Sequence, residues 1–154
     1  MVILKNMDIN SHRYIHLSNR DSFDIYPGNT SDDFTVKISP ELSFNNLSKW
    51  EIGISELSFT PKAEFTNLCV CTSICIPSNI GQNQLPILRH VSTLNTPEKH
   101  LFIYTTPHYI QMSTKFLDEI RIYITDREGN RTSFTDFETF VTLHIRKKEL
   151  NNGH

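Results

Sequence analysis

Seven histidines are the side chains of this sequence best suited to acid–base or metal chemistry. His12 and His16 are four positions apart, a spacing that on a helix would place both rings beside one metal ion. Tyr14 and Ile15 lie between them and favour a strand, along which four residues span about 13 Å, too far for a shared ion. The other five stand singly, at positions 90, 100, 108, 144 and 154. We therefore predict that His12 and His16 are solvent-facing strand histidines, and we predict no metal site.

Three cysteines, Cys69, Cys71 and Cys75, stand close together. An odd number in one short stretch is a poor disulfide framework, and the spacing is not that of a zinc knuckle. If residues 68–76 form one strand, all three thiols share a face, opposite Leu68, Val70, Ile74 and Ile76. We expect small buried thiols in a reducing compartment.

Three acidic pairs could bind calcium or act as acid and base: Asp32 with Asp33, Asp118 with Glu119, and Asp126 with Glu128. Each pair lies beside a predicted turn, where carboxylates commonly accept hydrogen bonds from backbone amides. The sequence contains no Gly-x-Ser-x-Gly elbow, no His-Glu-x-x-His pair and no phosphate-binding glycine loop, and only 5 of its 154 residues are glycine. The sequence thus predicts no enzyme and no cofactor.

Composition narrows the class of protein further. A chain of 154 residues is one domain by size, and 38% hydrophobic residues are enough to form a core. The formal net charge is -2, which gives no reason to expect strong nucleic-acid binding. No apolar run approaches the roughly 20 residues of a membrane helix, and the first residues lack a signal-peptide core. We expect a protein that neither contacts membranes nor carries a cleaved signal.

Residues 33–59 are the stretch that organises the predicted fold. Two segments alternate at period two, the first through Phe34, Val36 and Ile38 and the second through Trp50, Ile52 and Ile54. Beyond Ile54 the apolar positions shift by one residue, to Leu57 and Phe59, which predicts a β-bulge or a bend. The link between the segments is itself partly apolar, so we expect it to cross from one sheet to another and not to form a tight hairpin.

Turn residues divide the rest of the chain into further short strands, which brings the total to about eight. We predict an all-β fold, a single jelly-roll sandwich with Greek-key connections and at most one short helix, at residues 113–119. Residues 126–130 are predicted to form a hairpin loop that joins strands 119–125 and 140–146. The expected organisation is a flexible arm at residues 1–11, the sandwich at 12–146 and a polar tail at 147–154.

Several aromatic residues fall at positions that the inward alternation does not claim. Because interfaces favour tyrosine and phenylalanine, these residues suggest a second buried surface. A large core with generous edges would account for part of them. The predicted subunit-interface residues are Phe23, Tyr26, Phe65, Tyr109 and Tyr123.

Five segments together resemble one family. They are residues 22–38 (SFDIYPGNTSDDFTVKI), 49–57 (KWEIGISEL), 107–110 (PHYI), 116–129 (FLDEIRIYITDREG) and 140–146 (FVTLHIR). In this order they are similar to the small jelly-roll proteins of Polinton/Maverick elements and adintovirus-like double-stranded DNA viruses. The likeness covers most of residues 20–146, but nothing between 60 and 105 shares in it.

The resemblance implies a structural virion protein, a minor capsid subunit of the penton type, located at the capsid vertex and assembled inside the host cell. The implied partners are further copies of the chain, as a homopentamer, and a major capsid protein. The competing interpretation is a sandwich that recognises a glycan or peptide through loops such as 77–84 and 92–99. Trp50, the only tryptophan, follows the core alternation and so counts against a lectin.

Overall fold

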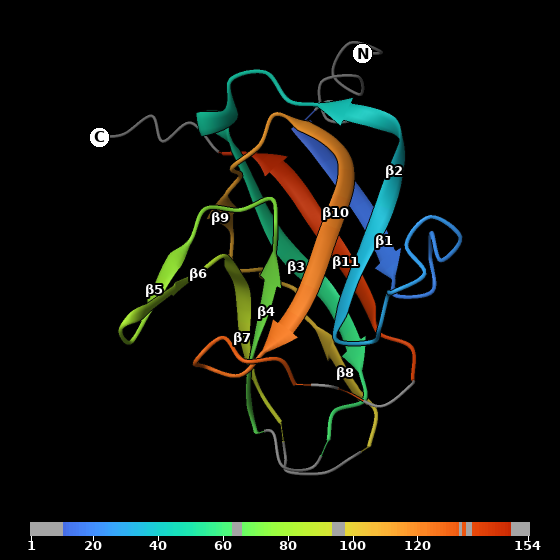
Figure 1. Ribbon diagram of the computed structural model, residues 1–154. Coiled ribbons are helices and arrows are strands. Elements are labelled where there is room, and N and C mark those ends of the chain that lie inside the picture. The colour runs from blue at the N-terminus through green and yellow to red at the C-terminus, as the bar shows by residue number, and fades with distance from the viewer. Residues whose placement is uncertain (1–10, 63–65, 94–97, 133, 135–136, 149–154) are drawn as a thin grey trace.

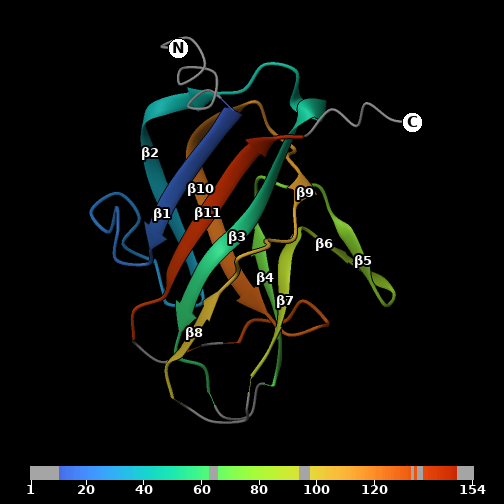
Figure 2. The ribbon, with the colours of Figure 1, turned by 180° about the vertical axis from the view of Figure 1, so that it is seen from behind.

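The computed structural model describes residues 11–62, 66–93, 98–132, 134 and 137–148, which form two β-sheets packed face to face. The four-stranded sheet lies in front in Figure 1, and the five-stranded sheet lies in front in Figure 2. In spatial order the five-stranded sheet contains β1 (His12–Ser18), β11 (Phe140–Lys147), β3 (Trp50–Phe59) and β8 (His100–Ile103), and the short β9 (Ile110–Gln111) also pairs with β3. The four-stranded sheet contains β2 (Asp33–Ser43), β10 (Phe116–Thr125), β4 (Asn67–Thr72) and β7 (Ile87–Ser92). A separate hairpin, β5 (Ser78–Ile80) with β6 (Asn83–Leu85), projects from one side in both views.

The pairing of the strands is nested and antiparallel. β1 pairs with β11, β2 with β10, β3 with β8 and β4 with β7, so the chain is one long hairpin rolled into two layers. The roll closes where β11 pairs with β3 and β10 with β4. This is the connectivity of a jelly roll. The predicted fold class is confirmed: eight strands build the sandwich, and three short ones (β5, β6 and β9) bring the total within the described residues to eleven.

The core lies between the sheets and follows the alternation of the sequence. Phe34 and Val36 of β2 and Ile52 and Ile54 of β3 belong to one core cluster, and all four side chains are buried. Opposite β3, the register of β11 shifts by one residue between Thr142 and Leu143. The predicted bulge in β3 is thereby confirmed, as is the crossing of the chain between sheets after β2.

The predicted hairpin between residues 119–125 and 140–146 is wrong. β10 pairs with β2 and β4, whereas β11 pairs with β1 and β3 in the other sheet. The hairpin was predicted because both strands alternate cleanly and a turn follows the first of them. Two strands that lie in facing layers show the same pattern. Each strand has both of its edges occupied by other partners, so residues 126–139 pass from one layer to the other.

The predicted helix at 113–119 is also wrong. Phe116 and Leu117 already belong to β10, where they pair with Ser43 and Leu42 of β2, and Leu117 is buried in the core. Apart from Ser11, the first described residue, the helical part of the described chain is a 3-10 turn at Leu47–Lys49. The predicted loop at 77–84 contains the β5–β6 hairpin.

The predicted burial of the three cysteines is confirmed, but the prediction that they share one strand face is wrong. All three thiols are free and buried. The strand ends at Thr72, and the turn that follows returns Cys75 to the core beside Ile74, whereas Cys69 and Cys71 lie on the other face of β4. The three cysteines therefore do not share one strand face. Burial raises the pKa of Cys71 and Cys75 to about 12, so both remain thiols at neutral pH.

Residues 1–10 of the predicted arm and 149–154 of the predicted tail lie outside the described residues, and Lys147 belongs to β11. In the described part of the chain, no helix has the length and apolar character needed to cross a membrane.

Candidate functional site

The outer face of the five-stranded sheet carries the most unusual set of side chains in the described structure. Because β1, β11, β3 and β8 are in register, their outward residues form rows across the sheet. One end of the face carries histidines and tyrosines, and the other end carries aliphatic side chains. The rows are His12–Arg146–Glu51, Tyr14–His144–Gly53, His16–Thr142–Glu56–Ile103 and Phe140–Ser58–Leu101.

His144 lies at the centre of the polar end and is only 6% exposed. Its Nε2 is 3.0 Å from Nδ1 of His12, and its Nδ1 is 2.7 Å from the hydroxyl of Tyr109. The ring of Tyr14 stacks on it with centroids 4.5 Å apart. We call these four residues, His12, Tyr14, Tyr109 and His144, the histidine–tyrosine cluster. Both ring nitrogens of His144 are thus engaged within the chain.

Tyr109 reaches His144 because the connector that carries it crosses directly over β3. At the crossing point stands Gly53, where an added Cβ would lie 2.9 Å from the His108 carbonyl oxygen, 3.0 Å from Cβ of Pro107 and 3.3 Å from Cδ1 of Tyr109. Only a residue without a side chain permits this approach. Gly53 therefore sets the distance between the connector and the sheet.

A cation covers the other side of Tyr109. The guanidinium carbon of Arg146 lies 3.5 Å from the centroid of the Tyr109 ring, and Arg146 Nε donates to Glu51 Oε1 at 2.9 Å. Burial, His12 and Arg146 together lower the pKa of His144, because each disfavours the imidazolium. Burial also raises the pKa of Tyr109, which keeps its hydroxyl protonated as a hydrogen-bonding group.

The aliphatic end of the face is open to solvent. Leu101 and Ile103 of β8 are 63% and 65% exposed, and β8 is the last strand of its sheet. Between this end and the cluster, His16 stacks on Phe140 and its Nδ1 lies 3.0 Å from Thr142 Oγ1. Large apolar side chains beside an unpaired strand edge are typical of a contact surface.

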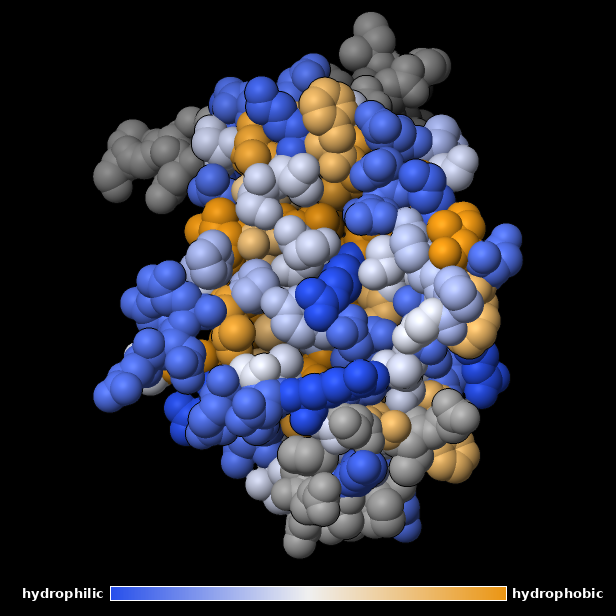
Figure 3. Space-filling view, in the orientation of Figure 1, coloured by the Kyte–Doolittle hydropathy of each residue, from blue (hydrophilic) through white to orange (hydrophobic). Residues whose placement is uncertain are grey.

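The outer face of the four-stranded sheet is chemically different and mainly hydrophilic (Figure 3). Arg121 binds both carboxylate oxygens of Asp33 at 2.9 Å and lies over the ring of Tyr123. Arg131 binds Asp32, whose side chain is 1% exposed. These two acidic residues, considered above for calcium or catalysis, hold the ends of strands together through arginine.

The other acidic pairs also have structural partners. Asp126 accepts backbone hydrogen bonds from Glu128 and Asn130, as predicted for a turn. Glu119 accepts a hydrogen bond from the hydroxyl of Tyr26, and Asp118 lies 3.8 Å from Lys37 Nζ. In the described residues no three histidine, cysteine or acidic side chains are placed to hold a metal ion.

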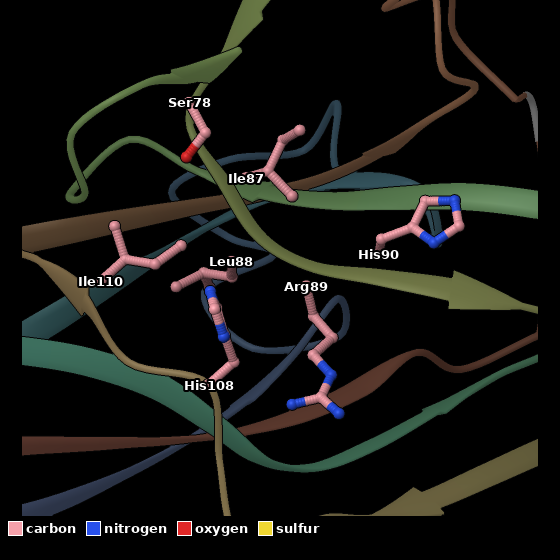
Figure 4. Close-up of a pocket in the computed structure, with 7 residues that line it drawn as sticks. All are labelled: Ser78, Ile87, Leu88, Arg89, His90, His108 and Ile110. Carbon is pink, nitrogen blue, oxygen red and sulfur yellow. The ribbon is translucent and has the colours of Figure 1, made fainter. Parts of the chain in front are cut away.

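A groove of about 360 Å³ lies where the two sheets part, beside the β5–β6 hairpin (Figure 4). It is lined by Ser78 of β5, by residues 87–90 of β7, by His108 from the connector and by Ile110 of β9. Arg89 and His90 leave β7 in different directions, and the guanidinium of Arg89 lies over the ring of Tyr104. The groove is therefore lined by apolar side chains together with the imidazoles of His90 and His108.

The structure separates the predicted subunit-interface residues. Tyr109 lies on the five-stranded face, and Tyr123 lies on the opposite, four-stranded face. Phe23, which is exposed, and Tyr26 lie in the loop between β1 and β2. Phe65 lies outside the described residues. The four described residues thus do not form one patch.

Sequence reasoning missed the histidine–tyrosine cluster as a unit. The alternation of β1 and β11 did place His12, Tyr14 and His144 outward, and that was the available signal. What the sequence did not contain was the pairing of these two strands and the path of the connector over Gly53.

Comparison with known proteins adds no assignment, since no protein-family model and no curated protein matches this chain.

Proposed function

We propose that this protein is a structural subunit of an icosahedral virion shell, a minor capsid protein of the penton type. In this proposal it assembles inside the host cell, with copies of itself and with a major capsid protein, at the capsid vertex. Support comes from the single jelly roll, from the sequence segments similar to those of small viral jelly-roll proteins, and above all from the outer face of the five-stranded sheet.

The observation that carries the proposal is the exposure of Leu101 and Ile103 next to a row of aromatic and histidine side chains. Each of these aliphatic side chains loses roughly 1.5–3 kcal/mol of transfer free energy by remaining in water when it could be buried. In a monomer this apolar strip stays in contact with water, whereas an interface between subunits would bury it.

The two faces of the sandwich are suited to contact each other in a ring. Subunits around a rotation axis meet through two different surfaces, which must be complementary. The five-stranded face presents aromatic and aliphatic groups with the exposed Glu56, whereas the opposite face presents Arg121 and Tyr123. Arginine against aromatic rings and carboxylates is a favourable pairing at interfaces.

The test is sedimentation velocity of the purified protein over a range of concentrations, followed by electron microscopy. We expect a closed ring in the wild type and loss of the ring in Ile103→Asp. Ile76→Asp is the matched control, because Ile76 is also exposed but precedes β5, away from β8. A species that stays monomeric at high concentration, and that does not bind a co-expressed major capsid protein, would overturn the proposal.

The groove beside the β5–β6 hairpin favours a second candidate, a module that binds a glycan or peptide. Its volume of about 360 Å³ is at the lower end of small-ligand sites. Binding of the monomer to a glycan array, lost in His108→Ala and retained in His12→Ala, would rank this function above the shell.

A further inference from the structure

Each of the two hydrogen bonds within the histidine–tyrosine cluster can form in either direction, depending on which atom carries the proton. In one arrangement the Tyr109 hydroxyl donates to His144 Nδ1, and His144 Nε2–H donates to His12 Nδ1. In the other arrangement both bonds run in the reverse direction. The first arrangement requires both imidazoles to be neutral. The second requires only His144 to be neutral, because His12 then donates through Nδ1 and places no demand on its Nε2.

One added proton leaves both hydrogen bonds possible, but on His144 it produces an imidazolium in a place that disfavours it. The ring of His144 is nearly buried between Tyr14 and the connector. The groups that face it are His12 and Tyr14 from β1, Arg146 from β11, Tyr109 from the connector and Glu51 from β3. The one carboxylate among them, Glu51, is already bound to Arg146.

A second added proton is incompatible with the geometry. With both histidines charged, His12 Nδ1 and His144 Nε2 would each carry a hydrogen across a separation of 3.0 Å. Neither atom would then be an acceptor, and the two positive rings would repel each other. The rings must separate, and the Tyr109–His144 contact depends on the position of the same ring.

We propose that the chain of hydrogen bonds from His12 through His144 to Tyr109 is an acid-sensitive contact that holds the connector at Pro107–Tyr109 on the five-stranded face. Protonation releases the connector from Gly53 and so changes the surface through which subunits meet. The second step rests on the proposed function, with a second copy of this chain as the partner, whereas the first step is a property of the single chain.

The consequence for assembly is a ring that is stable at neutral pH and dissociates in acid. Each proton taken up on dissociation weakens the association about tenfold per pH unit in the range where His144 titrates. Acid sensitivity of this kind differs from general acid unfolding, because it depends on the contact between His144 and His12.

The experiment uses the full chain in two forms. The monomeric form is the Ile103→Asp variant, in which long-range ¹H–¹⁵N spectra follow the imidazole of His144 while amide exchange at Gly53 and the ring signals of Tyr109 follow the connector. The assembled form is the wild type, whose ring is followed by sedimentation between neutral pH and pH 5. His144→Gln removes the titrating group, and His90→Gln, an exposed histidine on β7, is the matched control.

We expect the Gly53 and Tyr109 signals to change together with the titration of His144, and this step to be absent in His144→Gln and present in His90→Gln. Tyr109→Phe keeps the ring under Arg146 but lacks the hydroxyl, so it should lose the coupling even if His144→Gln folds poorly. Unchanged Gly53 exchange through the titration, or the same acid step in His144→Gln, would overturn the contact.

The assembled form tests the second step. A ring that dissociates in acid in the wild type and persists in His144→Gln supports it, and equal dissociation of both refutes it. If no ring exists at neutral pH, the proposed function fails and the link to assembly fails with it, while the spectra of the monomer still decide whether the contact is acid-sensitive.

Discussion

Replacing Gly53 by alanine tests whether the connector is held against β3 as described. The added Cβ would lie 2.9 Å from the His108 carbonyl oxygen and 3.0 Å from Cβ of Pro107. Ordinary contact distances are about 3.5 Å, so the connector would have to move by about half an ångström. Both neighbours belong to the connector itself and not to the end of a flexible side chain, so the movement carries Tyr109 with it.

The expected cost combines three contributions, two that destabilise the fold and one that stabilises it. Overpacking of this kind costs about 1–3 kcal/mol, and weakening the Tyr109–His144 hydrogen bond adds roughly 0.5–1.5 kcal/mol. Alanine restores about 0.5–1 kcal/mol, because it restricts the unfolded chain more than glycine does. We therefore expect Gly53→Ala to lower the free energy of unfolding by about 1–3 kcal/mol.

Urea denaturation followed by circular dichroism measures this difference. Gly28→Ala is the matched control, since nothing in the described part of the chain lies within 4 Å of a Cβ added there, and its stability should change by less than about 0.5 kcal/mol. Gly53→Ala and Tyr109→Phe should be non-additive, because both act on the same contact. A Gly53→Ala protein as stable as the wild type would refute the close approach of the connector.

Three further predictions follow from the same structure. The pKa of His144 is lowered in the folded state, so the unfolded chain binds the extra proton first as the pH falls. The contribution of neutral His144 to stability is complete above the ordinary pKa of about 6.5 and is lost as the pH falls towards the folded-state pKa. The free energy of unfolding should change by at most about 1.4 kcal/mol per pH unit in this range, and His144→Gln should remove this dependence. Cys71 and Cys75 should resist iodoacetamide in the folded protein and react after unfolding in urea, as read by mass spectrometry, and rapid labelling of the native protein would contradict their burial. Asp32→Asn should destabilise the protein by about 1–3 kcal/mol, because the carboxylate of Asp32 is buried against Arg131. Asp33→Asn should cost less than about 1 kcal/mol, because the pair of Asp33 with Arg121 is partly exposed. Equal costs for the two variants in thermal unfolding would be evidence against this difference.

Strand positions could be read from the sequence because each sandwich strand buries one face, and alternation records that burial directly. Trp50, Ile52 and Ile54 in β3 are an example, and the phase change at Leu57 even located the bulge. Strand partners were harder to predict. β10 and β11 alternate in the same way whether they pair with each other or lie in facing layers, so the predicted hairpin was wrong.

The candidate site could be predicted only in its parts. The outward positions of His12, Tyr14 and His144 were visible as the polar phase of two strands. His12 and His144 are 132 residues apart in the sequence and meet only because β1 pairs with β11. Tyr109 joins them only because Gly53 has no side chain in its way. Both are tertiary features that no local pattern records. The short helix failed for a related reason, since burial of Leu117 between the sheets overrides a polar segment with a capping serine.

The most direct test of a shell-building role is the mass of the particle that the purified wild-type chain forms at neutral pH, measured by native mass spectrometry. A discrete closed oligomer, five copies in the penton proposal, that is lost in Ile103→Asp agrees with an interface on the five-stranded face. A wild-type mass equal to that of the single 17.9 kDa chain at every concentration tested would contradict it.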